Sequence, residues 1–307
     1  YAFLIAKAYI EHSLKRGLSV DEFASRLSFN FDIFGNFFEQ IAKFRAGRRL
    51  WAKIVKDEYG ATNPKSGWLR MIAGGGGGGL TIEQPEVNIA RSAYYALISA
   101  LSGTQTMALC SYDEAYTIPT EKAARISLRT MQLLIHEMGI ADTVDPLAGS
   151  WYVETLTNQM EAEMVKVMAE VDDMGGIVDA IATGKIQAAV AHQAYAHERG
   201  VQEGEICKVG VNCFREEEEG QGENVDVEFH PYNTDDADKQ MRRLTELRES
   251  RDSAAVQAAL AALRKAAETD ANTMPATIEA VKAYATVGEI TQVLKDVYGG
   301  FQEPLDF

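Results

Sequence analysis

Side chains that could bind a charged ligand lie beside short apolar stretches of this chain. In chain order they are Arg26, Ser28, Lys65, Arg70, Gln105, the segment 111–114 and Asp145. Guanidinium groups pair well with phosphate oxygens, so Arg26 and Arg70 could hold a phosphorylated ligand. The alternative for each cation is a salt bridge at the protein surface. Where strands alternate with helices, functional groups gather where strands end, and we expect these residues at such positions.

Two carboxylates and one amide could bind neutral groups. Asp113 and Glu114 directly follow an apolar stretch and precede a helix that Pro119 initiates. One carboxylate could accept hydrogen bonds from sugar hydroxyls, while the other places negative charge near a helix N-terminus. Gln105 lies within an apolar run, where an amide is either a satisfied core residue or a group that bonds a substrate.

Six consecutive glycines occupy residues 74–79, between an apolar stretch at 68–72 and the helix-starting sequence around Thr81 and Pro85. Glycine has no Cβ, so such a run lets a large flat or phosphorylated group contact the main chain. A flexible linker is the alternative. The apolar stretch before the run and the helix start after it favour a ligand cradle. A phosphate-binding P-loop is not indicated, because no Lys-Ser or Lys-Thr pair follows the glycines.

Composition narrows the class of protein. The formal charge of -15 disfavours a nucleic-acid partner. Cys110, Cys207 and Cys213 match neither a disulfide framework nor a zinc site, which predicts a reducing compartment. His192 and His197 are five residues apart, so no metal site is expected. No membrane span or signal peptide is indicated, and we predict an acidic cytoplasmic enzyme.

The order of elements predicts an α/β fold. About four β/α units are expected, with strands at 26–31, 68–73 and 104–110, a fourth extended piece within 141–152, and helices at 36–58, 85–101, 119–138 and 152–171. Four units make the C-terminal half of a (β/α)8 TIM-type barrel. An open half exposes two sheet edges, so the other half must come from the same polypeptide or from another chain. The first residue is Tyr1, and truncation at the N-terminus is expected.

The chain changes character near residue 200. We predict a barrel half at 1–200 and a mainly helical linker region at 201–307. The acidic segment 216–219 is interpreted as a solvated loop. Residues 235–285 and a shorter stretch after 287 are predicted to be helical.

Seven motifs, in unbroken order, resemble the large-subunit barrel of the methylmalonyl-CoA mutase family. They are residues 26–29, 48–51, 80–86, 103–105, 111–115, 142–147 and 209–212. Members of this family are adenosylcobalamin-dependent acyl-CoA mutases that rearrange a carbon skeleton through radicals within a closed barrel. The resemblance implies that activity, and a non-catalytic coenzyme A-binding or assembly subunit is the alternative.

The resemblance also implies roles for individual residues. Arg26, Ser28, Lys65, Arg70 and Gln105 would bind the acyl-CoA, and Gly74, Gly77, Glu114, Ala115 and Ile118 would bind the cofactor, with Gln105 and Glu114 as the catalytic pair. These roles agree in kind with the chemistry of the side chains, since cations suit phosphates and carboxylates suit hydroxyls.

Two departures from the family pattern stand out. The family has His and Gln where this chain has Ile72 and Gly74, which predicts an acyl group bulkier or less polar than methylmalonyl. The Asp-x-His-x-x-Gly sequence that supplies the lower cobalamin ligand does not occur, and the chain ends at Phe307, where that domain would begin. A separate small cobalamin-binding subunit and an oligomeric assembly are therefore expected. The sequence does not identify the acyl group.

Overall fold

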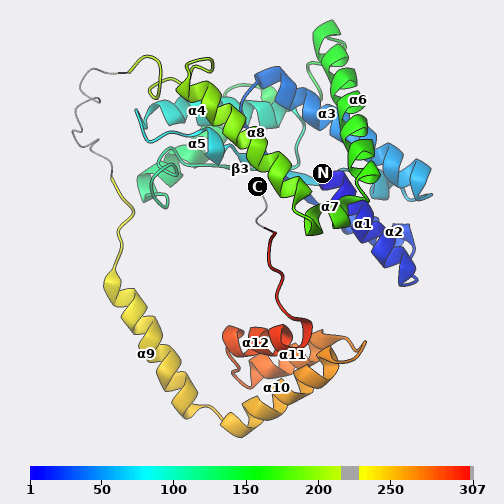
Figure 1. Ribbon diagram of the computed structural model, residues 1–307. Coiled ribbons are helices and arrows are strands. Elements are labelled where there is room, and N and C mark those ends of the chain that lie inside the picture. Colours follow the sequence, from blue (N-terminus) through cyan, green and yellow to red (C-terminus); the bar gives the residue numbers. More distant parts are fainter. Residues whose placement is uncertain (216–227, 305–307) are drawn as a thin grey trace. The chain divides into compact units, whose positions relative to one another are not determined.

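A computed structural model describes residues 1–215 and 228–304. The chain forms two compact units, Tyr1–His230 and Pro231–Pro304, and each is described by itself. The fold is α/β and mostly helical, with one small parallel sheet in the first unit (Figure 1). The predicted acidic loop at 216–219 lies outside the described residues. None of the described helices is long and apolar enough to cross a membrane.

The sheet contains three parallel strands in the order β1-β2-β3. They are β1 (Phe29–Asp32), β2 (Met71–Gly75) and β3 (Thr106–Leu109). Helix α3 (Phe37–Lys53) and the π-helical turn η2 (Ile54–Glu58) follow β1, α4 (Val87–Leu101) follows β2, and α5 (Glu121–His136) follows β3. Three of the predicted β/α units are therefore confirmed, with strands that begin up to three residues later than expected.

One face of the sheet is covered by helices. Phe29 and Phe31 of β1 stack on each other and pack edge-on against Phe3 of helix α1 (Ala2–Lys15). Met71 and Ala73 of β2 join the same core, as do Trp51 of α3 and Ile98 of α4. Both crossover helices therefore pack on a single face of the sheet.

The opposite face of the sheet is open. The register aligns Asn30 with Ile72, Asp32 with Gly74, and these two β2 residues with Thr106 and Ala108 of β3. These side chains alternate with the core residues, and those of β1 and β3 are exposed. Apart from Ile72, the open face is thus lined by small or polar side chains, in contrast to the aromatic core on the other side.

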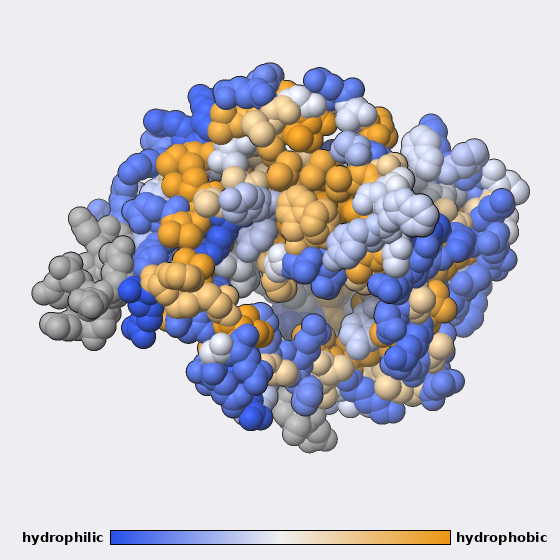
Figure 2. All heavy atoms as spheres, turned by 90° about the horizontal axis from the view of Figure 1, so that it is seen from above, coloured by the Kyte–Doolittle hydropathy of each residue, from blue (hydrophilic) through white to orange (hydrophobic). Residues whose placement is uncertain are grey.

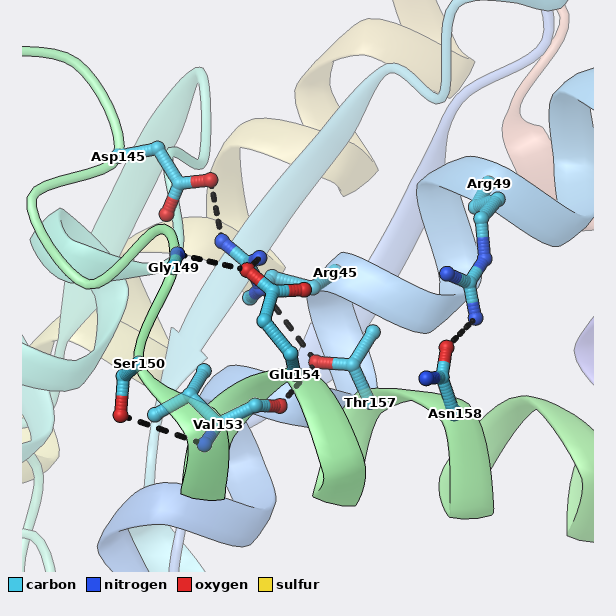
Figure 3. A network of polar contacts seen from close by, with 9 residues as sticks. All are labelled: Arg45, Arg49, Asp145, Gly149, Ser150, Val153, Glu154, Thr157 and Asn158. Atoms are coloured by element: carbon cyan, nitrogen blue, oxygen red, sulfur yellow. Dashed lines mark hydrogen bonds and ion pairs between the residues drawn. The ribbon is translucent and has the colours of Figure 1, made fainter.

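A polar network joins α3 to helix α6 (Trp151–Asp173), as Figure 3 shows. Arg45 is 10% exposed, pairs with Asp145 and Glu154, and donates to the Thr157 hydroxyl. Ser150 caps α6 by accepting from the Val153 N–H. The network fixes α6 along α3.

The fourth extended piece predicted within 141–152 is wrong. Residues Ile140–Asp142 form a short 3-10 helix, and a turn follows in which Asp145 has a φ of 48°. Pro146 cannot donate to a ladder, and the ion pair with Arg45 holds the Asp145 carboxylate against α3. Asp145 is therefore a structural residue here and does not end a strand.

Helices α7 (Ile177–Ala182) and α8 (Lys185–Gln202) complete the first unit. A disulfide between Cys207 and Cys213 closes the loop after α8, so the expectation of unpaired cysteines is wrong for these two. The Asn212 amide donates to the carbonyls of Val201 and Ile206, which folds this loop back and brings the cysteines together.

The second unit is helical, as predicted. It contains α9 (Thr234–Ser250), α10 (Ser253–Ala267), α11 (Thr273–Lys282) and α12 (Val287–Tyr298), and the last three pack around Val256, Leu263 and Val293. Arg251 forms a two-pronged pair with Glu289, whose carboxylate also completes the capping box of α12 with Thr286. This pair ties the end of α9 to the start of α12.

Candidate functional site

The predicted ligand-binding residues separate onto the two edges of the sheet. Arg26, Ser28, Arg70 and Gln105 precede the strands and lie at the amino edge, not where the strands end as expected. The reason is local: Arg26 belongs to the 3-10 turn η1 (Ala24–Arg26), and the ladder starts only where the Phe29 N–H donates to the Arg70 carbonyl. The glycine run and Glu114 lie at the carboxyl edge.

The amino edge presents cations. Arg26, Ser28, Lys65 and Arg70 are exposed, and neither Arg26 nor Lys65 forms an ion pair among the described residues. Arg70 donates to the Ser25 carbonyl at 3.0 Å, which leaves other guanidinium donors open. This edge can therefore accept a phosphorylated group.

A carboxylate that sequence reasoning missed holds the loop that carries Lys65. Asp21 accepts hydrogen bonds from the Thr62 N–H and hydroxyl, the Asn63 N–H and the Ser66 hydroxyl. These donors, the Thr62 N–H above all, lower the pKa of Asp21 to about 2. Lys65 itself lies in the short 3-10 helix η3 (Pro64–Gly67), which Asn63 caps.

Gln105 is exposed at the amino edge, and its Oε1 accepts from the Met71 N–H at 2.8 Å. The amide therefore bridges β3 to the first residue of β2. Its Nε2 donates to none of the described residues, so this group is open to a ligand carbonyl.

Three of the six glycines are required by packing. A Cβ on Gly75 would lie 2.3 Å from the Cys110 nitrogen, and one on Gly79 would lie 2.2 Å from the Tyr95 hydroxyl. Gly76 has a φ of 73°, and a Cβ there would also meet Tyr95. The run is thus an ordered turn wrapped around Tyr95, which includes the 3-10 helix η4 (Gly77–Gly79), and is not a flexible linker.

The other glycines leave main chain uncovered. Gly77 and Gly78 are exposed, and a Cβ on Gly78 would meet nothing within 4 Å. Gly74 lies on the open face, where a Cβ would lie 3.2 Å from an oxygen of Asp32. The outer side of the loop can therefore lie flat against a large ligand, as glycine allows.

Cys110 lies between the glycine loop and Glu114. Its thiol bonds the Glu114 carboxylate and accepts from the Gly77 N–H, and burial followed by the Glu114 charge raises the pKa of the thiol to about 11. Glu114 also accepts from the Ser111 N–H and forms no ion pair among the described residues. An exposed carboxylate held in this way can accept from hydroxyl groups.

Asp113 has the second of the two roles considered for this pair. It is 1% exposed, and its Oδ2 accepts from the N–H and hydroxyl of Thr120, the N-cap of α5. Ala115 and Ile118 follow in the same connection, where Ile118 is 70% exposed. Glu114 is therefore the carboxylate of this segment that is available to a ligand.

Asn88 fixes the two carboxyl-edge loops relative to each other. Its amide exchanges hydrogen bonds with the main chain of Thr81, after the glycine run, and donates to the Tyr112 carbonyl, before Glu114. Sequence reasoning missed Asn88 and Tyr95. The sequence signal that could have indicated Tyr95 is a large aromatic residue after a run of glycines, because its ring packs where the glycines have no side chains.

The fold and the site thus define a parallel α/β protein. Cations lie at one edge of its sheet, and a glycine cradle with a carboxylate lies at the other. The pattern described as methylmalonyl-CoA mutase matches residues 1–300, and the chain belongs to the methylmalonyl-CoA mutase family. The chain is 43% identical to the 2-hydroxyisobutanoyl-CoA mutase large subunit of Aquincola tertiaricarbonis over 98% of its own length and 54% of that protein. It is 38% identical to methylmalonyl-CoA mutase of Cereibacter sphaeroides, over 97% of this chain and 42% of the relative.

A human relative extends the comparison. Human mitochondrial methylmalonyl-CoA mutase is 38% identical over 95% of this chain and 38% of the human protein. The chain therefore spans about half the length of these relatives or less.

Proposed function

We propose that this chain is the carboxyl-terminal part of the catalytic barrel of an adenosylcobalamin-dependent acyl-CoA mutase, an isomerase. The observation that carries the proposal is the separation of groups between the two edges of the sheet. The family resemblance assigns Arg26, Ser28, Lys65 and Arg70 to coenzyme A, and all precede strands. It assigns Gly74, Gly77, Glu114, Ala115 and Ile118 to the cofactor, and these lie at or beyond the carboxyl ends of strands.

An elongated substrate suits this arrangement. β2 spans five residues, or roughly 16 Å at the usual rise per residue. Phosphates bound at the amino edge would leave the acyl group to extend over the open face toward the glycine loop. The free Nε2 donors of Gln105 would bond a carbonyl along that path.

The carboxyl edge fits adenosylcobalamin. Gly77 and Gly78 offer bare main chain to a flat macrocycle, and the Glu114 carboxylate would bond the adenosyl ribose hydroxyls. When bound, this cofactor supplies the adenosyl radical that removes hydrogen from the substrate. Gly74 and Ile118 would line the same pocket, and the closed barrel would exclude water.

The barrel assignment rests on the position of the crossover helices. In doubly wound sheets the helices cover both faces, whereas α3 and α4 both pack on the aromatic face of this sheet. The open face would then line the barrel interior. We propose a barrel half at residues 1–200 followed by a helical linker region at 201–307.

Partners are also proposed. The relative from Aquincola tertiaricarbonis is named a large subunit, and we propose a small cobalamin-binding subunit that supplies the lower axial ligand, within a cytoplasmic oligomer. Large apolar side chains of the first unit are exposed, among them Ile118, Val144 and Trp151, and Figure 2 shows apolar residues across a broad area of one face of the molecule. Such surfaces mark protein contacts.

Reconstitution tests the proposal. The complete polypeptide, a candidate cobalamin-binding subunit and adenosylcobalamin are mixed with acyl-CoA esters, and mass spectrometry follows the carbon skeleton. Isomerisation that requires both proteins supports the mutase. Acyl-CoA binding without isomerisation for any ester would favour a non-catalytic coenzyme A-binding subunit.

A further inference from the structure

Asp32 is a carboxylate on the open face of the sheet that the family resemblance does not assign. It is the last residue of β1, it is exposed, and the register places it beside Gly74 of β2. A Cβ on Gly74 would lie 3.2 Å from the Asp32 Oδ1, so the carboxylate reaches across the position where Gly74 has no side chain. The family pattern has a glutamine at that position.

Hydrogen bonds hold the Asp32 carboxylate in place. Oδ1 accepts from the N–H groups of Ile33 and Gly76, both at 2.9 Å. Oδ2 accepts no hydrogen bond from the described residues, and no described cation forms an ion pair with this carboxylate. One oxygen therefore orders the glycine loop and the other is available to a ligand.

Lys43 offsets only part of this charge. Its ammonium donates to the main-chain oxygen of Asp32 at 2.8 Å and lies 4.7 Å from the centre of the Phe44 ring, within the helix layer. Burial lowers the pKa of Lys43 to about 8. Glu39, in the first turn of α3, is a second carboxylate near Lys43. The open face itself carries no cation among its described residues, since its other members are Asn30, Ile72, Gly74, Thr106 and Ala108.

We propose that Asp32 is a specificity-determining residue that selects uncharged acyl groups and rejects acyl groups carrying a second carboxylate. The inference rests on the proposed function, which brings the acyl group onto this face. It also sharpens the expectation of an acyl group less polar than methylmalonyl, because an anionic oxygen from the neighbouring strand lies where the family pattern has a neutral amide. Two carboxylates close together in a site of low dielectric repel each other.

Matched substrates test this selection. Isobutanoyl-CoA and methylmalonyl-CoA differ by a methyl group in place of a carboxylate, and their binding to the complete polypeptide is measured by calorimetry. Wild type is expected to bind isobutanoyl-CoA at least tenfold more tightly. Asp32→Asn keeps the Oδ1 acceptor for Ile33 and Gly76 but removes the charge, so it should improve methylmalonyl-CoA binding about tenfold, or ~1.4 kcal/mol, and leave isobutanoyl-CoA binding within about twofold.

Two further variants complete the test. Asn30→Asp adds a carboxylate to the same face and should weaken methylmalonyl-CoA binding further, while Glu39→Gln removes a charge on the helix side and should change neither ligand. Equal binding of both esters by wild type, or an unchanged preference in Asp32→Asn, overturns the inference and leaves the proposed function standing. Failure of both esters to bind wild type overturns both.

Discussion

Alanine substitutions at two glycines of the run test which of these glycines the fold requires. In Gly79→Ala the new Cβ would lie 2.2 Å from the Tyr95 hydroxyl and 3.0 Å from Cζ, well inside normal contact distances. Overpacking of this kind costs about 1–3 kcal/mol. For a unit of this size such a loss lowers the melting temperature by about 2–12 °C. In Tyr95→Phe the hydroxyl is gone and the nearest atom is Cζ, so the same Gly79→Ala change should cost less than half as much.

The control lies one residue away. Gly78→Ala places the new Cβ in open space, and Gly78 has no positive φ. This substitution should therefore change the free energy of unfolding by less than about 0.5 kcal/mol. Urea unfolding of the two single alanine variants, Tyr95→Phe and the Gly79→Ala/Tyr95→Phe double variant gives the coupling free energy. Equal stability of Gly78→Ala and Gly79→Ala, or no coupling between positions 79 and 95, would refute the proposed packing of the loop.

Three further predictions follow from other contacts. Arg45→Met should destabilise the first unit by about 1–3 kcal/mol in urea unfolding, because it leaves Asp145 and Glu154 without their cation, whereas Arg49→Met, at a side chain 41% exposed, should cost less than about 1 kcal/mol. Hydrogen bonds from Arg251 and the Thr286 N–H lower the pKa of Glu289 to about 2 from 4.5. The stability that the charged Glu289 contributes is therefore complete above about pH 4.5 and is lost as the pH falls toward 2. Hydrogen-exchange protection of α12 should follow that decline, and Glu289→Gln should remove this pH dependence. Burial and the Glu114 charge raise the pKa of the Cys110 thiol to about 11. Iodoacetamide should therefore label Cys110 slowly at pH 8 with the disulfide intact, and Glu114→Gln should accelerate labelling several-fold. An unchanged rate in Glu114→Gln would exclude the Cys110–Glu114 contact.

Local patterns predicted four helices and three strands of the first unit. Residues 36–58 and 85–101 have long amphipathic periodicity, and helices α3 and α4 form there. The predicted strand at 141–152 failed because its conformation depends on Arg45, about 100 residues earlier in the chain. A partner so distant leaves no local signal.

The sequence predicted which residue types form the site, but not at which edge of the sheet each residue lies. Arg26 and Arg70 were expected where strands end, but β1 and β2 begin only after them, at Phe29 and Met71, so both side chains lie at the amino edge. The glycine run was expected to face a ligand throughout, yet Gly75, Gly76 and Gly79 are glycines because a Cβ there would clash with Cys110 or Tyr95. Asp32 stayed unnoticed because its proximity to Gly74 arises from pairing between strands.

Separate ligand binding at the two edges is the central claim, and one comparison tests it most directly. Equilibrium binding of coenzyme A and of adenosylcobalamin is measured for the Arg26→Ala/Lys65→Ala double variant and for Gly78→Ala, in the complete polypeptide with its cobalamin-binding partner. The amino-edge variant should lose about tenfold or more in affinity for coenzyme A and retain cobalamin binding, because two unpaired cations are removed from the phosphate site. Gly78→Ala should show the reverse. Loss of both ligands in both variants, with folding intact, would contradict the assignment of the two edges.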